Sequence, residues 1–298
     1  MMHHQSDTGR CRHCAARRSG FCSLLDPHSV EELASRSTLA EYPRETEIVL
    51  QGEPLDKVGI IASGMVKLGT VTEGGDEHLL QITRSGQLIS VPENTRSRYS
   101  WVTVTDTKVC WMPRSTWDQF LQEQPHHFRC YMVMMRYQLE QMQLSVMNMR
   151  GRSTLQRLAF WILDELAASE TGETGTLHIR LSRRDLASLL DMTVETLCRS
   201  LHKLHDKRAI ELLSPDHLNV LDPMKLRLVA RSHEEGFEAP LAQPQAVPSA
   251  RDWTNWSAAT PSAARDPRGL ALQMREARAE GDLPAPKPHP RPPGKPQG

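Results

Sequence analysis

The sequence predicts an α+β protein in which a β-roll is followed by a long helix and a C-terminal winged helix-turn-helix. Three observations predict this fold: glycine-punctuated β-rich runs between about residues 47 and 113, a helical segment with a narrow apolar stripe after Pro125, and a capped pair of helices at residues 181–206. The expected parts are an N-terminal cysteine segment (1–24), a β-roll (25–124), a dimerisation helix (125–151), a winged helix-turn-helix (152–232) and a tail (233–298).

Composition limits the classes of partner. The 298 residues suffice for two domains and a tail, and 36 basic side chains balance 36 acidic ones. A nucleic acid would therefore have to be bound by a local basic patch, not by overall charge. No apolar run reaches the ~18 residues needed to cross a bilayer, and the N-terminus lacks the apolar core of a signal peptide. We expect a cytoplasmic protein with no membrane partner.

Three of the six cysteines, Cys11, Cys14 and Cys22, lie together in the segment CRHCAARRSGFC. A Cys-x2-Cys pair can place two thiolates around one metal centre, and disulfides are rare in the cytoplasm. The arginines of the same segment, Arg12, Arg17 and Arg18, would favour the thiolate form. Zinc and an iron–sulfur cluster both accept four cysteine ligands, and the spacing does not separate them. The alternative is three unrelated thiols.

The next 90 residues predict a short helix and then the β-roll. Residues 27–37 are expected to form a helix that begins at its proline. The β-rich runs EIVLQG, GIIASG, MVKLGTVT, HLLQIT, QLISV and WVTVT then follow one another between glycine turns, which is typical of a small β-sandwich or rolled barrel. Cys110 lies in TKVCWMP at the end of this region and is the candidate for a fourth ligand.

The segment after Pro125 predicts a dimer helix. Its apolar residues are separated alternately by three and four positions, which is the a/d seam of a coiled coil; they are Met132, Met135, Leu139, Met142, Val146 and Met149. The alternative is a helix that packs only on its own domain. Because methionine is flexible, we expect a weak homodimer that a signal could consolidate.

The last folded part reads as a winged helix-turn-helix. A capping box at residues 153–156 opens a helix, the strand LHIRL follows, and AIELL and LNVLD flank the turn SPDH as a wing. Between them, Ser182 and Thr193 are expected to cap two helices.

The second of these helices has the pattern of a recognition helix. Leucines and Val194 at helical spacing face inward, which leaves Glu195, Cys198 and Arg199 on the opposite face, in the turns that reach base edges in a major groove. Arginine can bind guanine and glutamate can accept from cytosine. The alternative is a helical pair whose polar face is merely solvated. The full set of candidate DNA contacts is Glu195, Cys198, Arg199, Arg183, Arg184, Thr193, Thr196 and Lys203.

The tail differs from the rest of the chain. It holds 12 of the 20 prolines, within residues 234–298, and much alanine. Such a composition predicts disorder, with at most a short helix at residues 270–279. Trp253 and Trp256 are weak candidates for a contact site.

Together these features resemble the Crp/Fnr superfamily of bacterial transcription regulators, and within it the oxygen-sensing FNR branch. The resemblance covers about residues 11–230 and depends on the combination of the β-roll, the dimer helix, the segment TVETLCRSL and the four cysteines Cys11, Cys14, Cys22 and Cys110. It implies a cyclic-nucleotide-binding-like sensor domain and a [4Fe-4S] cluster on these four thiolates. It also implies that oxygen destroys the cluster, and that the intact cluster favours a homodimer that binds palindromic DNA and works with RNA polymerase.

Two positions depart from this resemblance. Cys198 stands where the FNR recognition helix usually has serine, and a thiol is a poorer hydrogen-bond donor than a hydroxyl. Gly86-Gln87 and Arg98-Tyr99 stand where cyclic-nucleotide-binding relatives have a glutamate shortly after a glycine and an Arg-Ser pair. Loss of the carboxylate that would hold a ribose hydroxyl argues against cAMP as the signal.

The sequence-based hypothesis is thus an oxygen-responsive transcription activator of anaerobic genes. We find no nucleophile–base pair or phosphate loop that would indicate an enzyme. One alternative keeps DNA binding but senses through zinc, thiols, haem or nitric oxide. The other is a metal-binding redox protein whose helix-turn-helix contacts protein.

Overall fold

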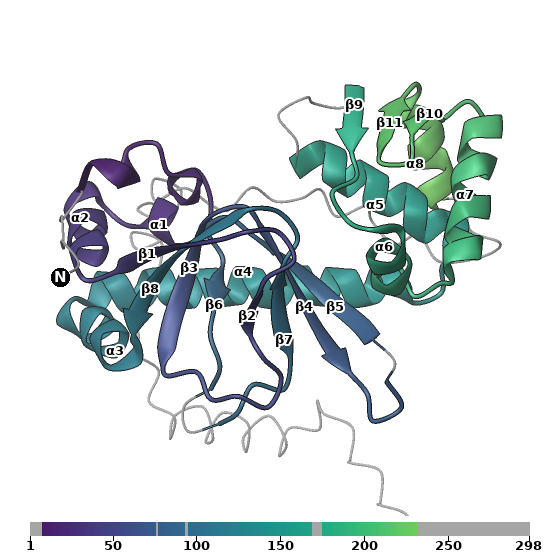
Figure 1. Cartoon of the computed structure of the whole chain (residues 1–298). Helices are drawn as coiled ribbons and strands as arrows, with labels where there is room; N and C mark the ends of the chain where they lie inside the picture. The colour runs from purple at the N-terminus through teal and green to yellow at the C-terminus, as the bar shows by residue number, and fades with distance from the viewer. Residues whose placement is uncertain (1–7, 76, 93–94, 169–174, 232–298) are drawn as a thin grey trace, which may run out of the picture. The chain divides into compact units, whose positions relative to one another are not determined.

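The computed structural model describes residues 8–75, 77–92, 95–168 and 175–231 (Figure 1). The predicted disordered tail, with Trp253, Trp256 and the short helix at residues 270–279, lies outside the described residues. The domain boundaries expected from the sequence stay predictions. None of the described helices has the length and apolar character needed to cross a membrane.

The predicted β-roll consists of two four-stranded antiparallel sheets, ordered β1-β8-β3-β6 and β2-β7-β4-β5. Side chains between the sheets form its core, and Ile61, Val66, Ile89 and Val109 are fully buried there. This confirms the α+β fold class. The strands are β1 (Thr38–Tyr42), β2 (Glu47–Val49), β3 (Lys57–Ser63), β4 (Met65–Val71), β5 (Glu77–Arg84), β6 (Leu88–Ile89), β7 (Ser100–Thr103) and β8 (Thr107–Pro113).

Strand β1 was not expected from the sequence, which placed the first strand at about Glu47. Its residues are half-buried or exposed, so the run TLAEY lacks a clear apolar alternation. Its place in the sheet nevertheless matters, because β1 and β3 flank β8 and hold Cys110 between Leu39 and Ile60. Strand β8, an inner strand of this sheet, therefore fixes the position of Cys110.

The N-terminal cysteine segment is packed on the β-roll by an approach of two glycines. A Cβ on Gly20 would lie 2.1 Å from the Gly86 carbonyl oxygen, and a Cβ on Gly86 would lie 2.0 Å from the Ser19 carbonyl oxygen. Both glycines have positive φ, +78° and +87°. The Phe21 N–H donates to the Gly86 carbonyl at 3.0 Å. Only glycine at both positions allows this contact.

The segment continues as short helices that cover the end of the sheets near β1 and β8 (Figure 1). They are two 3-10 turns, η1 (Thr8–Cys11) and η2 (Ala15–Arg17), followed by α1 (Phe21–Leu24) and α2 (Pro27–Ser35). Helix α2 begins at the predicted proline and is capped by Asp26, whose side chain accepts from the Ser29 N–H. Phe21 is fully buried, with its ring 4.9 Å from that of Trp117.

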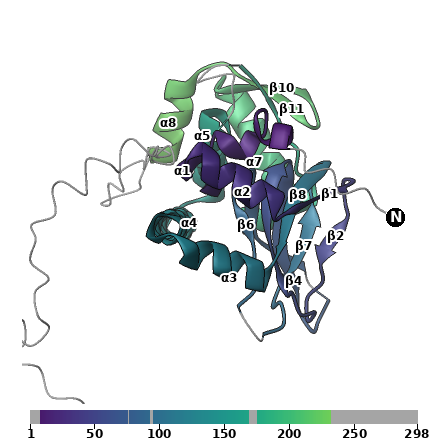
Figure 2. The same ribbon diagram turned by 90° about the vertical axis from the view of Figure 1, so that its left-hand side faces the viewer.

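Two helices follow the roll, α3 (Arg114–Glu123) and α4 (Pro125–Met149), and they pack together at the start of α4 (Figure 2). His127 is fully buried there: Nδ1 lies 2.8 Å from the Phe120 carbonyl oxygen and Nε2 lies 2.8 Å from Ser29 Oγ. Cys130, also buried, donates to the Leu24 carbonyl. These contacts anchor the first turns of α4 to the cysteine segment.

The C-terminal part forms the predicted winged helix-turn-helix around a core of fully buried leucines and Ile162. The Ser153–Gln156 capping box is present, since the Ser153 N–H donates to Gln156 Oε1 at 2.7 Å. The elements are α5 (Thr154–Ala168), β9 (Gly175–His178), α6 (Arg183–Leu189), α7 (Val194–Asp206), β10 (Ile210–Ser214), β11 (His217–Val220) and α8 (Pro223–Arg231). The strand expected at LHIRL is shifted: β9 ends at His178, because only that part pairs with β11.

We predict that Gly86→Ala displaces the cysteine segment from the β-roll. A positive φ costs an L-residue about 1–2 kcal/mol, and the overlap with the Ser19 carbonyl should add a further ~1–3 kcal/mol. Chemical denaturation should show the lower stability, and Cys22 should react faster with a thiol reagent because its segment opens.

The matched control is Gly52→Ala. Gly52 has the same φ of +87°, but an added Cβ there meets nothing within 4 Å. This variant should lose only the backbone contribution and leave the reactivity of Cys22 unchanged. Equal losses in the two variants would show that the glycine contact does not hold the segment.

Candidate metal centre and nucleic-acid interface

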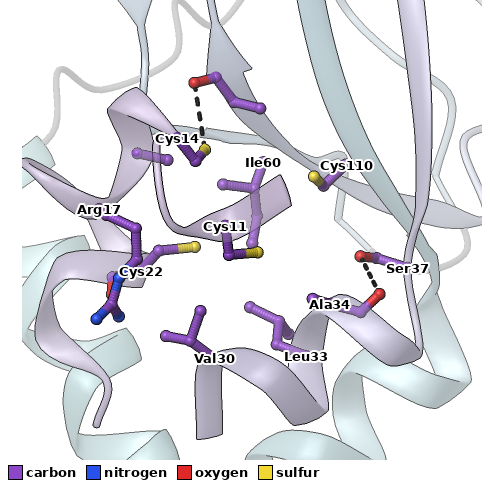
Figure 3. Close-up of a pocket in the computed structure, with 12 residues that line it drawn as sticks. Cys11, Cys14, Arg17, Cys22, Val30, Leu33, Ala34, Ser37, Ile60 and Cys110 are labelled. Atoms are coloured by element: carbon purple, nitrogen blue, oxygen red, sulfur yellow. Dashed lines mark hydrogen bonds between the residues drawn. The ribbon is translucent and has the colours of Figure 1, made fainter. Parts of the chain in front are cut away.

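The four cysteines expected to bind one group do line one cavity. Cys11 ends η1, Cys14 precedes η2, Cys22 lies in α1 and Cys110 lies on β8. Figure 3 shows their four side chains directed into the same space. The other lining residues are mostly apolar: Ala16, Arg17, Val30, Leu33, Ala34, Ser37, Ile60 and Ala62. No carboxylate or imidazole is among these described residues, so the cavity offers thiols as its metal-binding groups.

The thiols are close enough to influence one another. Burial raises the pKa of Cys110 to about 11. Burial, followed by repulsion from the thiolates of Cys14 and Cys110, raises the pKa of Cys22 far more, and the pKa of Cys11 is raised by burial and by Cys14. Crowded, buried thiols are therefore poor acids by themselves. A cation among them would instead favour the thiolate form, because a coordinated thiol is deprotonated.

Two arginines act on the cavity: Arg17 lines it, and Arg10, which was not expected, binds the backbone of two lining residues. Arg17 donates to the Cys22 carbonyl at 3.0 Å and lies beside Cys22 in Figure 3. Arg10 donates to the carbonyls of Ala34 and Ser37, at 2.5 and 2.9 Å. The charges of Arg10 and Arg17 act to lower the pKa of Cys11.

Of the arginines named from the sequence, Arg17 lies beside Cys22, whereas Arg12 and Arg18 are exposed. Arg10 was not named, although its charge acts on the thiols of Cys11 and Cys110. Arg10 stands one position before the first cysteine. The sequence alone does not indicate that its side chain binds backbone carbonyls at the C-terminal end of α2.

The apolar stripe of α4 is largely uncovered. Met132, Leu139, Met142 and Val146 are 50–56% exposed, whereas Met135 and Met149 are half-buried against the neighbouring cores. Phe128, which is 52% exposed, lies four positions before Met132 and extends the stripe by one further step. Phe128 was not among the predicted seam residues, although the same spacing continues back to that position. The seam is thus an apolar surface on the described single chain, of the kind a partner helix covers.

The helix pair has the predicted caps. Ser182 Oγ accepts from the Asp185 N–H and Thr193 Oγ1 from the Thr196 N–H. Leu197, Leu201 and Leu204 are buried as expected, but Val194 is 41% exposed, so its inward orientation was wrong. The reason is that Val194 is the first residue of α7, where the helix has not yet reached the core.

The outer face of α7 carries the expected polar residues. Glu195, Arg199 and Lys203 are exposed and Cys198 is half-buried. The Arg199 guanidinium touches only the Thr196 hydroxyl among the contacts described, at 3.3 Å. His202, exposed on the same face three positions after Arg199, was not among the predicted contacts. Arg184 is exposed, whereas the Arg183 guanidinium donates to the Pro215 carbonyl in the wing.

Comparison with known proteins identifies both halves of the described chain. Residues 39–124 match the cyclic nucleotide-binding domain, and residues 156–229 match the Crp-like helix-turn-helix domain. The order of these two domains, joined by α4, decides the assignment. The chain belongs to the Crp/Fnr family. It is therefore a transcription regulator of helix-turn-helix type, a class of proteins that are generally not enzymes.

Several Crp/Fnr relatives are similar to this chain over most of their own length. The transcriptional activatory protein AadR of Rhodopseudomonas palustris is 25% identical over 74% of this chain and 93% of its own. The transcriptional activator protein FnrL of Cereibacter sphaeroides is 22% identical over 76% and 94%. The solved structure of FixK2 from Bradyrhizobium japonicum superimposes with a TM-score of 0.60 at 19% identity, over 66% of this chain and 98% of that one. At this identity the structural likeness establishes the fold alone.

Proposed function

We propose that this Crp/Fnr regulator is an oxygen-responsive activator in which Cys11, Cys14, Cys22 and Cys110 hold a [4Fe-4S] cluster. The observation that carries the proposal is the convergence of these four thiols on one cavity whose other lining side chains are mostly apolar. Four cysteine thiolates are the ligand set of such a cluster. When bound, the cluster would supply an oxygen-labile centre whose presence depends on the ambient oxygen level.

The spacing of the sulfur atoms favours a cluster over a single zinc ion. Zinc–sulfur bonds of about 2.3 Å in tetrahedral geometry place the sulfurs about 3.8 Å apart. Within the part of the chain that the structure describes, no three of these cysteines form a group whose ligand atoms all lie within 4.8 Å of one another. A group that is itself several ångströms wide suits thiols that are not gathered this closely better than one ion does.

The surrounding residues also suit an anionic group. Arg10 and Arg17 bring two positive charges to the cavity, and each is held in place by backbone carbonyls. Because the cavity wall is otherwise mostly apolar, these charges act with little screening by water. We infer that they offset part of the negative charge that four thiolates bring.

The same packing provides a route from the cysteines to the dimer helix. The Phe21 ring lies 4.9 Å from Trp117, and Trp117 lies 5.9 Å from Tyr131 at the start of α4. Met135, a seam residue, packs against the same core as Cys11 and Cys22. Cluster assembly would thus favour one arrangement of the cysteine segment over another. Because Met135 packs on the same core, that arrangement would also fix the position of the seam, which is coupling by population shift.

The proposed regulator would act by binding DNA. Dimerisation through α4 would present two α7 helices to half-sites of a palindrome about one helical turn apart. We propose the cytoplasm as the location and RNA polymerase as a further partner, as the resemblance implies. Cyclic AMP is disfavoured, because Gln87 replaces the expected carboxylate and the Gly86 carbonyl is already used to bind the Phe21 N–H.

We predict that protein purified without oxygen is brown and holds about four iron atoms per chain, and that air bleaches it. Cys110→Ser should abolish the cluster as fully as Cys14→Ser, because all four ligands are needed. Iron and sulfide analysis with absorbance spectra measures this. Cys198→Ala is the matched control, since its thiol lies on α7 away from the cavity lining, and it should retain full iron.

Other outcomes would identify the alternative sensors. A colourless protein with one zinc ion per chain, or a haem spectrum that survives Cys110→Ser, would overturn the cluster proposal. Bleaching by nitric oxide without a response to oxygen would keep the cluster but change the signal.

We predict that Leu139→Ala weakens the dimer. Burying a leucine side chain contributes about 1.5–3 kcal/mol, and both chains lose it, so the dissociation constant should rise ~100-fold or more. Analytical ultracentrifugation under anaerobic conditions measures this. Glu140→Ala, exposed but off the seam, is the control and should change the constant little. Equal effects of the two changes would mean that α4 dimerises through another face or not at all.

We predict that Arg199→Ala costs ~1–3 kcal/mol in binding to the specific site and relaxes discrimination at one base pair. Lys203→Ala should weaken specific and random DNA alike, because a phosphate contact carries no sequence information. Gel-shift titrations on both kinds of DNA separate these effects. If Arg199→Ala lowers both affinities equally, α7 does not read bases directly, and a complete absence of DNA binding would favour the protein-contact alternative.

A further inference from the structure

The wing of the helix-turn-helix carries a cluster of metal-binding side chains that the proposed function does not use. His178 on β9 and His217 on β11 stand directly opposite each other in an antiparallel pair. Their rings are stacked, with centroids 4.3 Å apart and planes within 3°. Asp216 lies next to both: its carboxylate is 2.9 Å from His217 Nδ1 and 3.6 Å from His178 Nε2. One ligand atom from each of the three residues lies within 4.8 Å of the others.

We propose that His178, Asp216 and His217 form a binding site for a divalent transition-metal ion, with zinc as the ion the ligands suit best. Zinc binds imidazole nitrogen and carboxylate oxygen at about 2.0–2.2 Å, which separates neighbouring ligand atoms by about 3.3–3.6 Å in tetrahedral geometry. The 3.6 Å distance between His178 Nε2 and the Asp216 carboxylate already lies within this range. Magnesium and calcium are disfavoured because two of the three ligands are nitrogen.

The backbone around the cluster is held in place before any ion binds. The Ile179 N–H donates to the Asp216 carbonyl at 2.7 Å, which ties the turn to the residue after His178. The Arg183 guanidinium donates to the neighbouring Pro215 carbonyl and ties the same turn to the first turn of α6. The ligands therefore need side-chain adjustment only, and an ordered backbone lowers the entropic cost of binding.

Charge and access also suit a metal ion. Hydrogen bonds from Ser214 and His217 hold the pKa of Asp216 far below its usual range, so the carboxylate is ionised at neutral pH. The side chains of His178 and His217 are 52% and 41% exposed, which leaves an approach for the ion and a fourth coordination position for water. None of the three proposed ligands belongs to the lining of the cysteine cavity.

Zinc binding by the full-length chain tests the site. Wild type and the double variant His178→Ala/His217→Ala should be dialysed against the same free zinc concentration at neutral pH, and the bound zinc measured. The double variant should hold one zinc ion fewer per chain, because both proteins keep all six cysteines. Asp216→Asn, which preserves size, should weaken the binding at this site. The changed side chains are 41–56% exposed, and circular dichroism verifies the fold.

His78→Ala is the matched control. His78 is an exposed histidine on strand β5 and belongs to no ligand group among the described residues. It should leave the zinc count unchanged. In addition, zinc should shift the imidazole nitrogen resonances of His178 and His217 in wild type. Equal zinc in wild type and the double variant, or unshifted resonances, would overturn the proposal and leave a stacked, hydrogen-bonded histidine pair.

Discussion

The structure depends first on the contact between the backbones of Gly20 and Gly86. Neither position tolerates a Cβ. A Cβ on Gly20 would lie about 2 Å from the Gly86 carbonyl oxygen, and a Cβ on Gly86 would lie as close to the Ser19 carbonyl oxygen. The contact brings the N-terminal segment onto a turn that precedes strand β6, and the buried Phe21 side chain completes it. Three cysteines separated by almost 90 residues from the fourth thereby reach the cavity below β8. The contact therefore helps to hold the three N-terminal cysteines at the cavity.

A second consequence is that the segment is not an appendage of the β-roll. Its helices share one hydrophobic core with α3 and the beginning of α4, through Phe21, Trp117 and Cys130. The hydrogen bond between Ser29 and the buried His127 adds a polar link between α2 and α4, and breaking it would leave a buried group unsatisfied at a cost of about 1–3 kcal/mol. A disturbance at the cysteines therefore reaches helix α4 through direct packing, over a few side chains.

Features with a local cause were predictable from the sequence. The glycine-separated strands, the caps at Ser182 and Thr193, and the seam of α4 each follow from periodicity or from one hydrogen bond within three residues. Features that depend on remote pairing were not. Strand β1 lacks an apolar alternation and exists because β8 pairs with it. The His178–His217 pair arises only when β9 and β11 align, and nothing in the separation of the two residues indicates their register.

Helix α4 has one face that packs on the core of the cysteine segment and another that carries the seam. Under the proposed function, the residue that both faces share sets how much free energy a signal at the cysteines transmits to the seam. His127, Cys130 and Met134 are buried against the β-roll and the cysteine segment, whereas the seam residues Leu139, Met142 and Val146 are exposed. Met135 belongs to both, because it is a seam residue that packs on the core of the cysteine segment. Shifting a two-state equilibrium from 1% to 99% requires about 5.5 kcal/mol. Repacking one methionine in each chain, at about 1.5–3 kcal/mol apiece, approaches that amount. Under the proposed function, a seam rich in flexible methionines is therefore switched by a change at its first turns, whereas a rigid, strongly dimeric leucine seam would not respond.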